Sequence, residues 1–396
     1  MDSLLLCCAV VALALASPGS AQVSPRYETT TEATRRRHDR AADDWLGYSV
    51  RDDNLCYLNL TSRNIQRVPR AAFRNTPGMT YIILRNNNIS EVDVGAFEGV
   101  PQLHILDLDN NDISSLPVGV FSQVPALNYV YLSGNRIAEL SPGHFAGLTG
   151  LQRLNVNNNR AQLKLHNRTF ANQPHLEEIY LRRSNIRTLP RDVFANCTKL
   201  FRIDLKYNNI EELDNSTFYG LTELRYLYLS GNRLQTLQPA VFDELPSLSE
   251  LDLSDNRINY LSEENMHFRW SPRVDLTNNK IRYFHAHFYN NNRQVPTFIL
   301  NNNPYHCCSS LWSQKYSISA IQLPTLKIDN ATCDAPAHLR GTALSQLSEE
   351  SLGDCDTAAP DTSADSITTT EVPLAEVAST EIPTPSTEYL DTPTSY

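Results

Sequence analysis

The sequence predicts an α/β-type solenoid, with a curved parallel sheet on its concave side and irregular or 3-10 segments on its convex side. Two observations lead to this fold class. A pattern of roughly 24 residues recurs in near-constant register, and two of its columns hold asparagine and phenylalanine in most copies. Recurrence at a period of this size is typical of stacked repeats, in which each unit packs only against its neighbours.

The repeating unit is defined by apolar residues at fixed positions. The segments that begin at Leu103, Leu200 and Leu224 all fit the pattern L-x-x-L-x-L-x-x-N-x-L. Apolar residues at positions 4 and 6 alternate with polar ones, so each unit should supply one short strand with one buried face. Successive units are equally long, except that one is a residue longer and one a residue shorter. Eleven units begin at Leu55, Met79, Leu103, Leu127, Leu151, Leu176, Leu200, Leu224, Leu248, Ser271 and Val295.

Two further columns have structural roles. A buried amide must find hydrogen-bond partners, so the asparagines at position 9 should bond the backbone of adjacent units. They are Asn87, Asn111, Asn135, Asn159, Asn208, Asn232, Asn256, Asn279 and Asn303, with Ser184 in the sixth unit and Arg63 in the first. The phenylalanines at position 19 should stack along the convex side. They are Phe73, Phe97, Phe121, Phe145, Phe194, Phe218 and Phe242.

Cysteines flank the C-terminal end of the array. Asn303-Pro-Tyr-His-Cys307-Cys308 precedes Cys333-Asp-Ala-Pro, Leu339-Arg-Gly, Leu344, Leu347 and Cys355. Together with the repeats, this segment resembles extracellular leucine-rich-repeat proteins of the typical repeat class, such as Toll-like receptors, Slit and small matrix proteins. The resemblance implies a disulfide-bonded C-terminal cap over residues 303–355, with Cys307 paired to Cys333 and Cys308 to Cys355. The family usually separates its first two cysteines by one residue, whereas these two are adjacent, and other pairings stay open.

Two cysteines lie outside this cap. Cys56 resembles the last cysteine of the family's N-terminal cap, whose upstream cysteines are missing here. Cys197 occupies an apolar column and should be a buried thiol. A bridge between them is excluded, because stacking of the intervening strands separates them by over roughly 20 Å, against a limit of ~7 Å. Cys56 is therefore either covered by the N-terminal segment or available for an intermolecular bridge.

Several features indicate export. An apolar run from Leu4 to Ala16, followed by small residues, predicts a signal peptide cleaved after Ala16 or Ala21. No later segment has the apolar length of a membrane span, and the polar C-terminus lacks a lipid-anchor signal, so we expect a secreted, extracellular product without a membrane anchor. Six glycosylation sequons begin at Asn59, Asn88, Asn167, Asn196, Asn215 and Asn330.

The expected organisation has five parts. Residues 1–21 form the signal peptide, 22–54 a polar segment, 55–302 the repeats, 303–355 the cap and 356–396 a tail. The tail is acidic and rich in Thr, Ser and Pro, which predicts disorder, and an O-glycosylated stalk with a sulfated Tyr389 is the alternative. The basic run from Arg37 to Arg40 is either a protease processing site or a solvated charge run.

Function should lie on the concave face, at positions 2, 3, 5, 7 and 8 of each unit. This face is rich in tyrosine and arginine, which are enriched in binding hot spots. Arg183 and Lys206 add to a basic-aromatic centre, and Asp252, Asp255 and Asp275 follow it. Tyrosines also suit strand surfaces through cross-strand packing, which is the alternative interpretation. The candidate ligand-binding residues are Tyr81, Tyr129, Tyr131, Arg153, Tyr180, Arg182, Arg202, Tyr226 and Tyr228.

Composition and motifs narrow the class of function. A net charge of -10 is unfavourable for binding nucleic acids, whose phosphates attract clustered cations. The chain has no H-E-x-x-H or G-x-S-x-G motif, and His285-Ala-His287 alone is a weak metal pair, so we expect neither catalysis nor a metal or cofactor. The leading hypothesis is a secreted binding protein, in signalling or innate immunity, for an extracellular protein with an acidic patch or a sulfated glycan. The alternatives are a structural matrix component, with a homodimer bridged by Cys56, and a non-catalytic subunit of a secreted enzyme.

Overall fold

The computed structural model describes residues 56–261, 272–282, 297–307, 326–327, 331–347 and 352. The chain divides into two compact units, Met1–Cys355 and Asp356–Tyr396, and all described residues belong to the first. The signal peptide, the basic run at 37–40, the histidines 285 and 287, and the tail lie outside the described residues. So do Asn330, Cys308, Cys355 and the side chain of Cys56.

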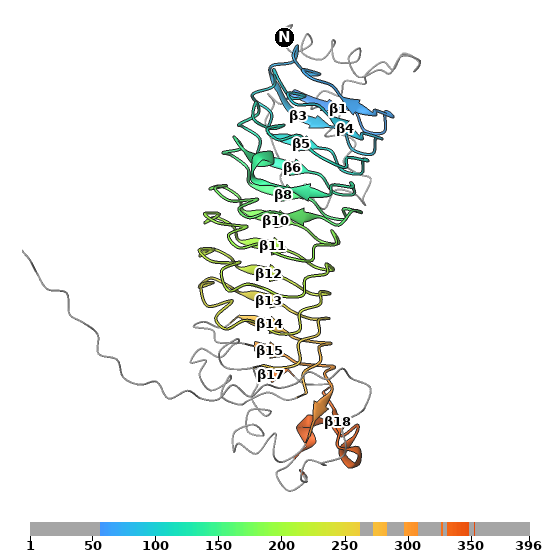
Figure 1. Cartoon of the computed structure of the whole chain (residues 1–396), viewed down its shortest axis with the longest axis vertical. Coiled ribbons are helices and arrows are strands. Elements are labelled where there is room, and N and C mark those ends of the chain that lie inside the picture. The colour runs from blue at the N-terminus through green and yellow to red at the C-terminus, as the bar shows by residue number, and fades with distance from the viewer. Residues whose placement is uncertain are drawn as a thin grey trace, which may run out of the picture. The chain divides into compact units, whose positions relative to one another are not determined.

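The described part of the first unit is built on a twelve-stranded sheet, whose strands stack in chain order (Figure 1). All neighbours are parallel, and apart from a shift at Cys56 in β1 they share one register, so that Leu106 pairs with Val130 and Val130 with Leu154. The strands are β1 (Cys56–Asn59), β3 (Met79–Ile83), β5 (Ile105–Asp107), β6 (Tyr129–Tyr131), β8 (Arg153–Asn155), β10 (Glu178–Tyr180), β11 (Arg202–Asp204), β12 (Tyr226–Tyr228), β13 (Glu250–Asp252), β14 (Arg273–Asp275), β15 (Thr297–Ile299) and β17 (Leu326–Lys327). The predicted solenoid is confirmed, and β17 extends it beyond the eleven repeats.

The segments between these strands are mostly turns, as expected. Short strands pair in three places, β2 (Arg67–Val68) with β4 (Glu91–Val92), β7 (Glu139–Leu140) with β9 (Lys164–Leu165), and β16 (Tyr305–His306) with β18 (Cys333–Ala335). The 3-10 turns are η2 (Pro142–Phe145), η3 (Ala337–Leu339) and η4 (Leu344–Gln346). No helix in the described part of the chain is long and apolar enough to cross a membrane.

The asparagine ladder forms as predicted. The side-chain Nδ2 of Asn111 donates to the carbonyl of Leu108 in its own repeat at 2.9 Å and to that of Leu84 in the preceding repeat at 3.1 Å. Its Oδ1 accepts the N–H of Ile89 at 3.0 Å. At Ser184 the hydroxyl donates to the carbonyl of Val156 at 2.9 Å. The ladder provides hydrogen-bond partners for backbone groups that would otherwise be buried without them. Polar side chains are therefore tolerated at this buried position.

The phenylalanine spine is also confirmed, and it has one more member than the sequence analysis assigned. Phe170 lies between Phe145 and Phe194, with ring centres 5.6 and 5.8 Å away. It was missed because it belongs to the longer repeat that begins at Leu151, in which one extra residue moves phenylalanine from position 19 to position 20. Phe170 is buried like the other phenylalanines of the spine. The extra residue is therefore accommodated between the start of this repeat and Phe170.

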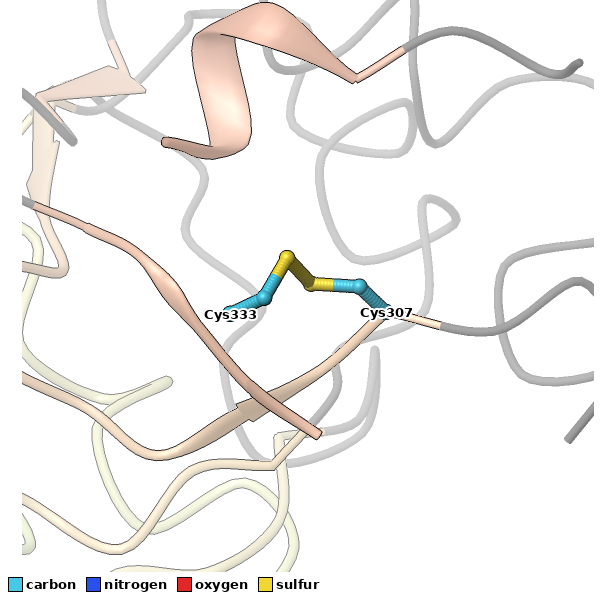
Figure 2. The surroundings of a disulfide bond; sticks show 2 residues. All are labelled: Cys307 and Cys333. Atoms are coloured by element: carbon cyan, nitrogen blue, oxygen red, sulfur yellow. A yellow bond between two sulfur atoms is a disulfide. The ribbon is translucent and has the colours of Figure 1, made fainter. Parts of the chain in front are cut away.

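The C-terminal end of the solenoid carries a disulfide between Cys307 and Cys333 (Figure 2). This bond joins the residue after β16 to the first residue of β18, and it confirms one of the two pairings that the family resemblance implied. Cys197 is the free cysteine among the described residues. It is fully buried, its thiol donates to the carbonyl of Phe170 at 2.9 Å, and burial raises its pKa to about 11. The expected buried thiol is therefore confirmed.

Candidate binding face

The exposed side of the sheet presents two columns of side chains, one from position 3 and one from position 5 of each repeat. Because the strands share one register, each column runs straight across the sheet. We call these columns, together with positions 7 and 8 that follow each strand, the sheet face. All nine residues predicted to bind ligand lie on it: Tyr81, Tyr129, Tyr131, Arg153, Tyr180, Arg182, Arg202, Tyr226 and Tyr228.

Arg153 is engaged within the protein. Its Nη2 atom lies 2.6 Å from Oε1 of Glu178, and its guanidinium carbon lies 5.8 Å from the centre of the Tyr129 ring. The hydroxyl of Tyr180 donates to the other oxygen of Glu178. Burial, and then this bond to a carboxylate, raise the pKa of Tyr180. The charge of Arg153 is therefore largely compensated before any partner binds.

Arg202 and Lys206 surround two tyrosines of β12. The guanidinium carbon of Arg202 lies 4.6 Å from the ring centre of Tyr226 and 5.4 Å from that of Tyr228. The ammonium of Lys206 lies 4.3 Å from the Tyr228 ring centre and 2.7 Å from Oδ2 of Asp252. Burial raises the pKa of Asp252, but bonds from Lys206 and Ser254 outweigh it and hold the pKa below its usual value. In this cluster both cations contact tyrosine rings, and the lysine is also paired with a carboxylate.

Arg182 and Arg183 contact a tyrosine that the sequence analysis did not single out. Their guanidinium carbons lie 4.9 and 5.0 Å from the ring centre of Tyr207. Tyr207 is 43% exposed, which is high for a large side chain in this structure. Neither arginine forms an ion pair with a carboxylate of the described residues. Arg153 and Lys206 each pair with a carboxylate, whereas Arg182, Arg183 and Arg202 have no ion-pair partner among the described residues.

A buried acidic pair lies toward the N-terminal end of the sheet face. Arg85 contacts Asp107 at 2.9 Å and Asp109 at 3.5 Å. Burial, and then repulsion from Asp107, raise the pKa of Asp109 to about 7. The carboxylate of Asp109 also accepts the N–H of Ser133 at 2.6 Å. This end of the face therefore changes charge near neutral pH.

The sequons lie mostly away from the sheet face. Asn59 lies in β1, at position 5 of the first repeat, whereas Asn88, Asn167, Asn196 and Asn215 are exposed outside the columns. Within the described residues, the sheet face from β3 to β15 carries no sequon. Glycans attached at these asparagines would leave the middle of the face open.

The family model for the leucine rich repeat matches residues 53–113, 101–161, 151–210 and 201–258. These ranges join into one stretch that covers more than half of the chain. The chain belongs to the leucine-rich-repeat family. No curated protein sequence matches it.

Several solved structures share the fold. A chain of the TLR13–ssRNA13 complex is 20% identical, with a TM-score of 0.58, over 75% of this chain and 40% of that one. A chain of the octameric complex of Latrophilin 3, Unc5D and FLRT2 is 20% identical, with a TM-score of 0.55, over 74% and 95%. A chain of the Toll–Spatzle complex from Drosophila is 22% identical, with a TM-score of 0.41, over 76% and 55%. The leucine-rich-repeat chain described here thus spans little more than half of the Toll complex chain and less than half of the TLR13 complex chain, and these likenesses concern the fold.

Proposed function

We propose that this leucine-rich-repeat chain is a secreted, non-enzymatic binding protein that recognises an extracellular protein with its sheet face. The stack of Arg202 on Tyr226 and Tyr228 carries the proposal. Tyrosine and arginine dominate binding hot spots because they offer large contact areas and polar groups at a low entropic cost. Side chains that are already held by their neighbours lose less freedom when a partner docks.

Two further observations favour a protein partner. The cations of the face are interleaved with Glu178, Asp204 and Asp252, which would repel a long sulfated glycan. The Latrophilin 3, Unc5D and FLRT2 assembly is an example of this fold in a complex between proteins. A net charge of -10 disfavours a nucleic-acid ligand. The resemblance to Toll-like receptors supports a role in signalling or innate immunity.

A glycan placed on the face tests the proposal. Tyr228→Asn creates an Asn-Leu-Ser sequon with Leu229 and Ser230, at the same repeat position as the natural sequon of Asn59. Asp112→Asn creates an Asn-Ile-Ser sequon at the position equivalent to Asn88, off the columns, and is the matched control. Tyr228→Gln changes the side chain without adding a glycan.

The secreted variants are screened against a library of displayed extracellular domains, and glycan attachment is checked by enzymatic deglycosylation. We expect a partner of the wild type to be lost with Tyr228→Asn, weakened with Tyr228→Gln and retained with Asp112→Asn. A partner retained by the glycosylated Tyr228→Asn variant would show that binding uses another surface.

A further inference from the structure

Position 8 of every described repeat has a left-handed backbone. Its φ angle lies between 52° and 72° from the first repeat to the last. Glycine, asparagine and aspartate adopt this conformation with the least strain, and bulky side chains avoid it. Most repeats follow this preference. Their residues are Asn86, Asn110, Gly134, Asn158, Gly231, Asp255, Asn278 and Asn302, and the first repeat has a small residue there, Ser62.

Arg183 and Tyr207 are the exceptions. They occupy position 8 in adjacent repeats, with φ angles of 52° and 55°. Strained backbone conformations persist at functional sites, where the side chain in question is needed in that place. Two departures from the rule in adjacent repeats, in contact with each other, indicate a site built for binding.

The position of the Tyr207 ring is set by the residues that surround it. A Cβ atom on Gly231 would lie 2.5 Å from Cδ1 of the tyrosine, so the ring rests directly on the backbone of the next repeat. The ring is also contacted by the guanidinium groups of Arg182 and Arg183, which occupy positions 7 and 8 of the preceding repeat. The ring thus lies within cation–π distance of both guanidinium groups.

Neither of these two guanidinium groups is in ion-pair contact with a carboxylate of the described residues. Asp204 is close enough to interact with the charge of Arg182, but its oxygen instead accepts the N–H of Lys206 at 3.0 Å, and it forms an ion pair with neither arginine. The Nε atom of Arg182 is buried and has no hydrogen-bond partner in the described structure. A buried donor without a partner is costly, so internal hydrogen bonding through this atom does not explain the position of the side chain.

A guanidinium is a planar fork of donors that matches the two oxygens of a carboxylate. We propose that Arg182, Arg183 and Tyr207 form a subsite for the carboxylate of an acidic segment in a partner protein. This subsite rests on the proposed function and names the chemistry of that partner. A sulfated glycan fits less well, because its repeated charges would meet Glu178, Asp204 and Asp252 on either side.

The probe is a fluorescein-labelled oligoglutamate peptide limited to two glutamates, so that its charges do not extend along the face to the flanking acids. An oligoglutamine peptide of the same length serves for comparison, and binding is measured by fluorescence anisotropy. Arg182→Gln and Arg183→Asn should each weaken oligoglutamate binding roughly tenfold, since each removes a charge-assisted contact. Tyr207→Asn should also weaken it, because the ring orients both arginines. Arg187→Gln removes an exposed arginine of the same repeat outside the sheet face and should have no effect.

A thermal melt separates binding from folding. Asparagine is the commonest residue at position 8, so Arg183→Asn should leave the melting temperature unchanged or raise it. Lowered stability together with unchanged peptide binding would mean that Arg183 is structural and would overturn the proposal. So would oligoglutamate binding that is absent from the wild type or equal in all variants.

Two further outcomes are decisive. A sulfated oligosaccharide that binds more tightly than oligoglutamate, with the same dependence on Arg182 and Arg183, would replace the acidic peptide as the ligand. A partner from the extracellular-domain screen that is lost with Tyr228→Asn but unaffected by Arg183→Asn would leave the sheet face as the binding surface and reject this subsite.

Discussion

The ring of Tyr207 lies against the backbone of Gly231, with only 2.5 Å between the tyrosine Cδ1 and the place where a Cβ atom would stand. Gly231→Ala should therefore destabilise the protein by about 2–3 kcal/mol, through this contact and through the left-handed φ of 69°. In a Tyr207→Asn background the cost should fall to about 1 kcal/mol, because only the backbone strain remains. Urea unfolding of the four proteins measures the difference, and equal costs in both backgrounds would show that the ring does not rest there.

Replacing one asparagine of the ladder should lower the stability of the protein strongly, although the change in side-chain size is small. Oδ1 of Asn208 accepts the N–H groups of Ser184 and Ile186 at 3.0 and 3.1 Å, and Asn208→Ala would leave both buried without a partner. We expect a loss of about 2–4 kcal/mol. Asn259→Ala, at an exposed asparagine outside the ladder, should cost less than about 0.5 kcal/mol. Similar losses for the two variants would contradict the proposed role of the ladder.

The raised pKa of Asp109 predicts that stability depends on pH. The folded protein holds this proton up to about pH 7, whereas an unfolded aspartate loses it near pH 4. Stability should therefore fall as the pH rises through this window, by an amount on the order of 4 kcal/mol, since each unit of the pKa difference contributes about 1.4 kcal/mol. Asp109→Asn should flatten the dependence of the melting temperature on pH, and it keeps an oxygen for the N–H of Ser133. An equally steep dependence in the variant would assign the effect to another group.

The Arg153–Glu178 pair should matter more for folding than for binding. Only 16% and 11% of these side chains are exposed, so Arg153→Met would leave a largely buried carboxylate without its cationic partner. We expect a loss of about 2–3 kcal/mol, of which adding Glu178→Gln should restore at least half. Denaturant unfolding of the double-mutant cycle tests this coupling. Additive effects would show that the pair is weak and that Arg153 is available to a ligand.

The Cys307–Cys333 disulfide should stabilise its own end of the solenoid. Because repeats contact only their neighbours, replacing both cysteines with alanine should loosen β16 and β18 and leave β10 to β12 protected. The expected loss is about 2–4 kcal/mol. Hydrogen exchange read strand by strand distinguishes this local effect from a uniform loss of protection, which would mean that the array unfolds as one unit.

Much of the fold could be predicted from the sequence, because the same physical constraints act on each repeat. Alternating leucines place one strand in each unit, and asparagine at position 9 is tolerated only where the ladder bonds it. Prediction from the repeat pattern failed where the spacing of the repeats changed or the repeats ended. Phe170 was overlooked because an extra residue moved it by one position, and β17 was not foreseen because Leu326–Lys327 lies outside the repeat register.

The candidate site divides in a similar way. The sequence determined which residues line the sheet face, since strand alternation and a constant register place Tyr226 and Arg202 there whatever their contacts. The sequence also contains two bulky residues, Arg183 and Tyr207, at the left-handed position 8 of adjacent repeats, and this departure from the column distinguishes them. Only the tertiary structure decided which charges are compensated. Arg153 meets an acid of the adjacent strand, Lys206 meets an acid two strands away, and Arg182 and Arg183 meet Tyr207. Pairing across the sheet depends on side-chain geometry that a linear pattern does not encode.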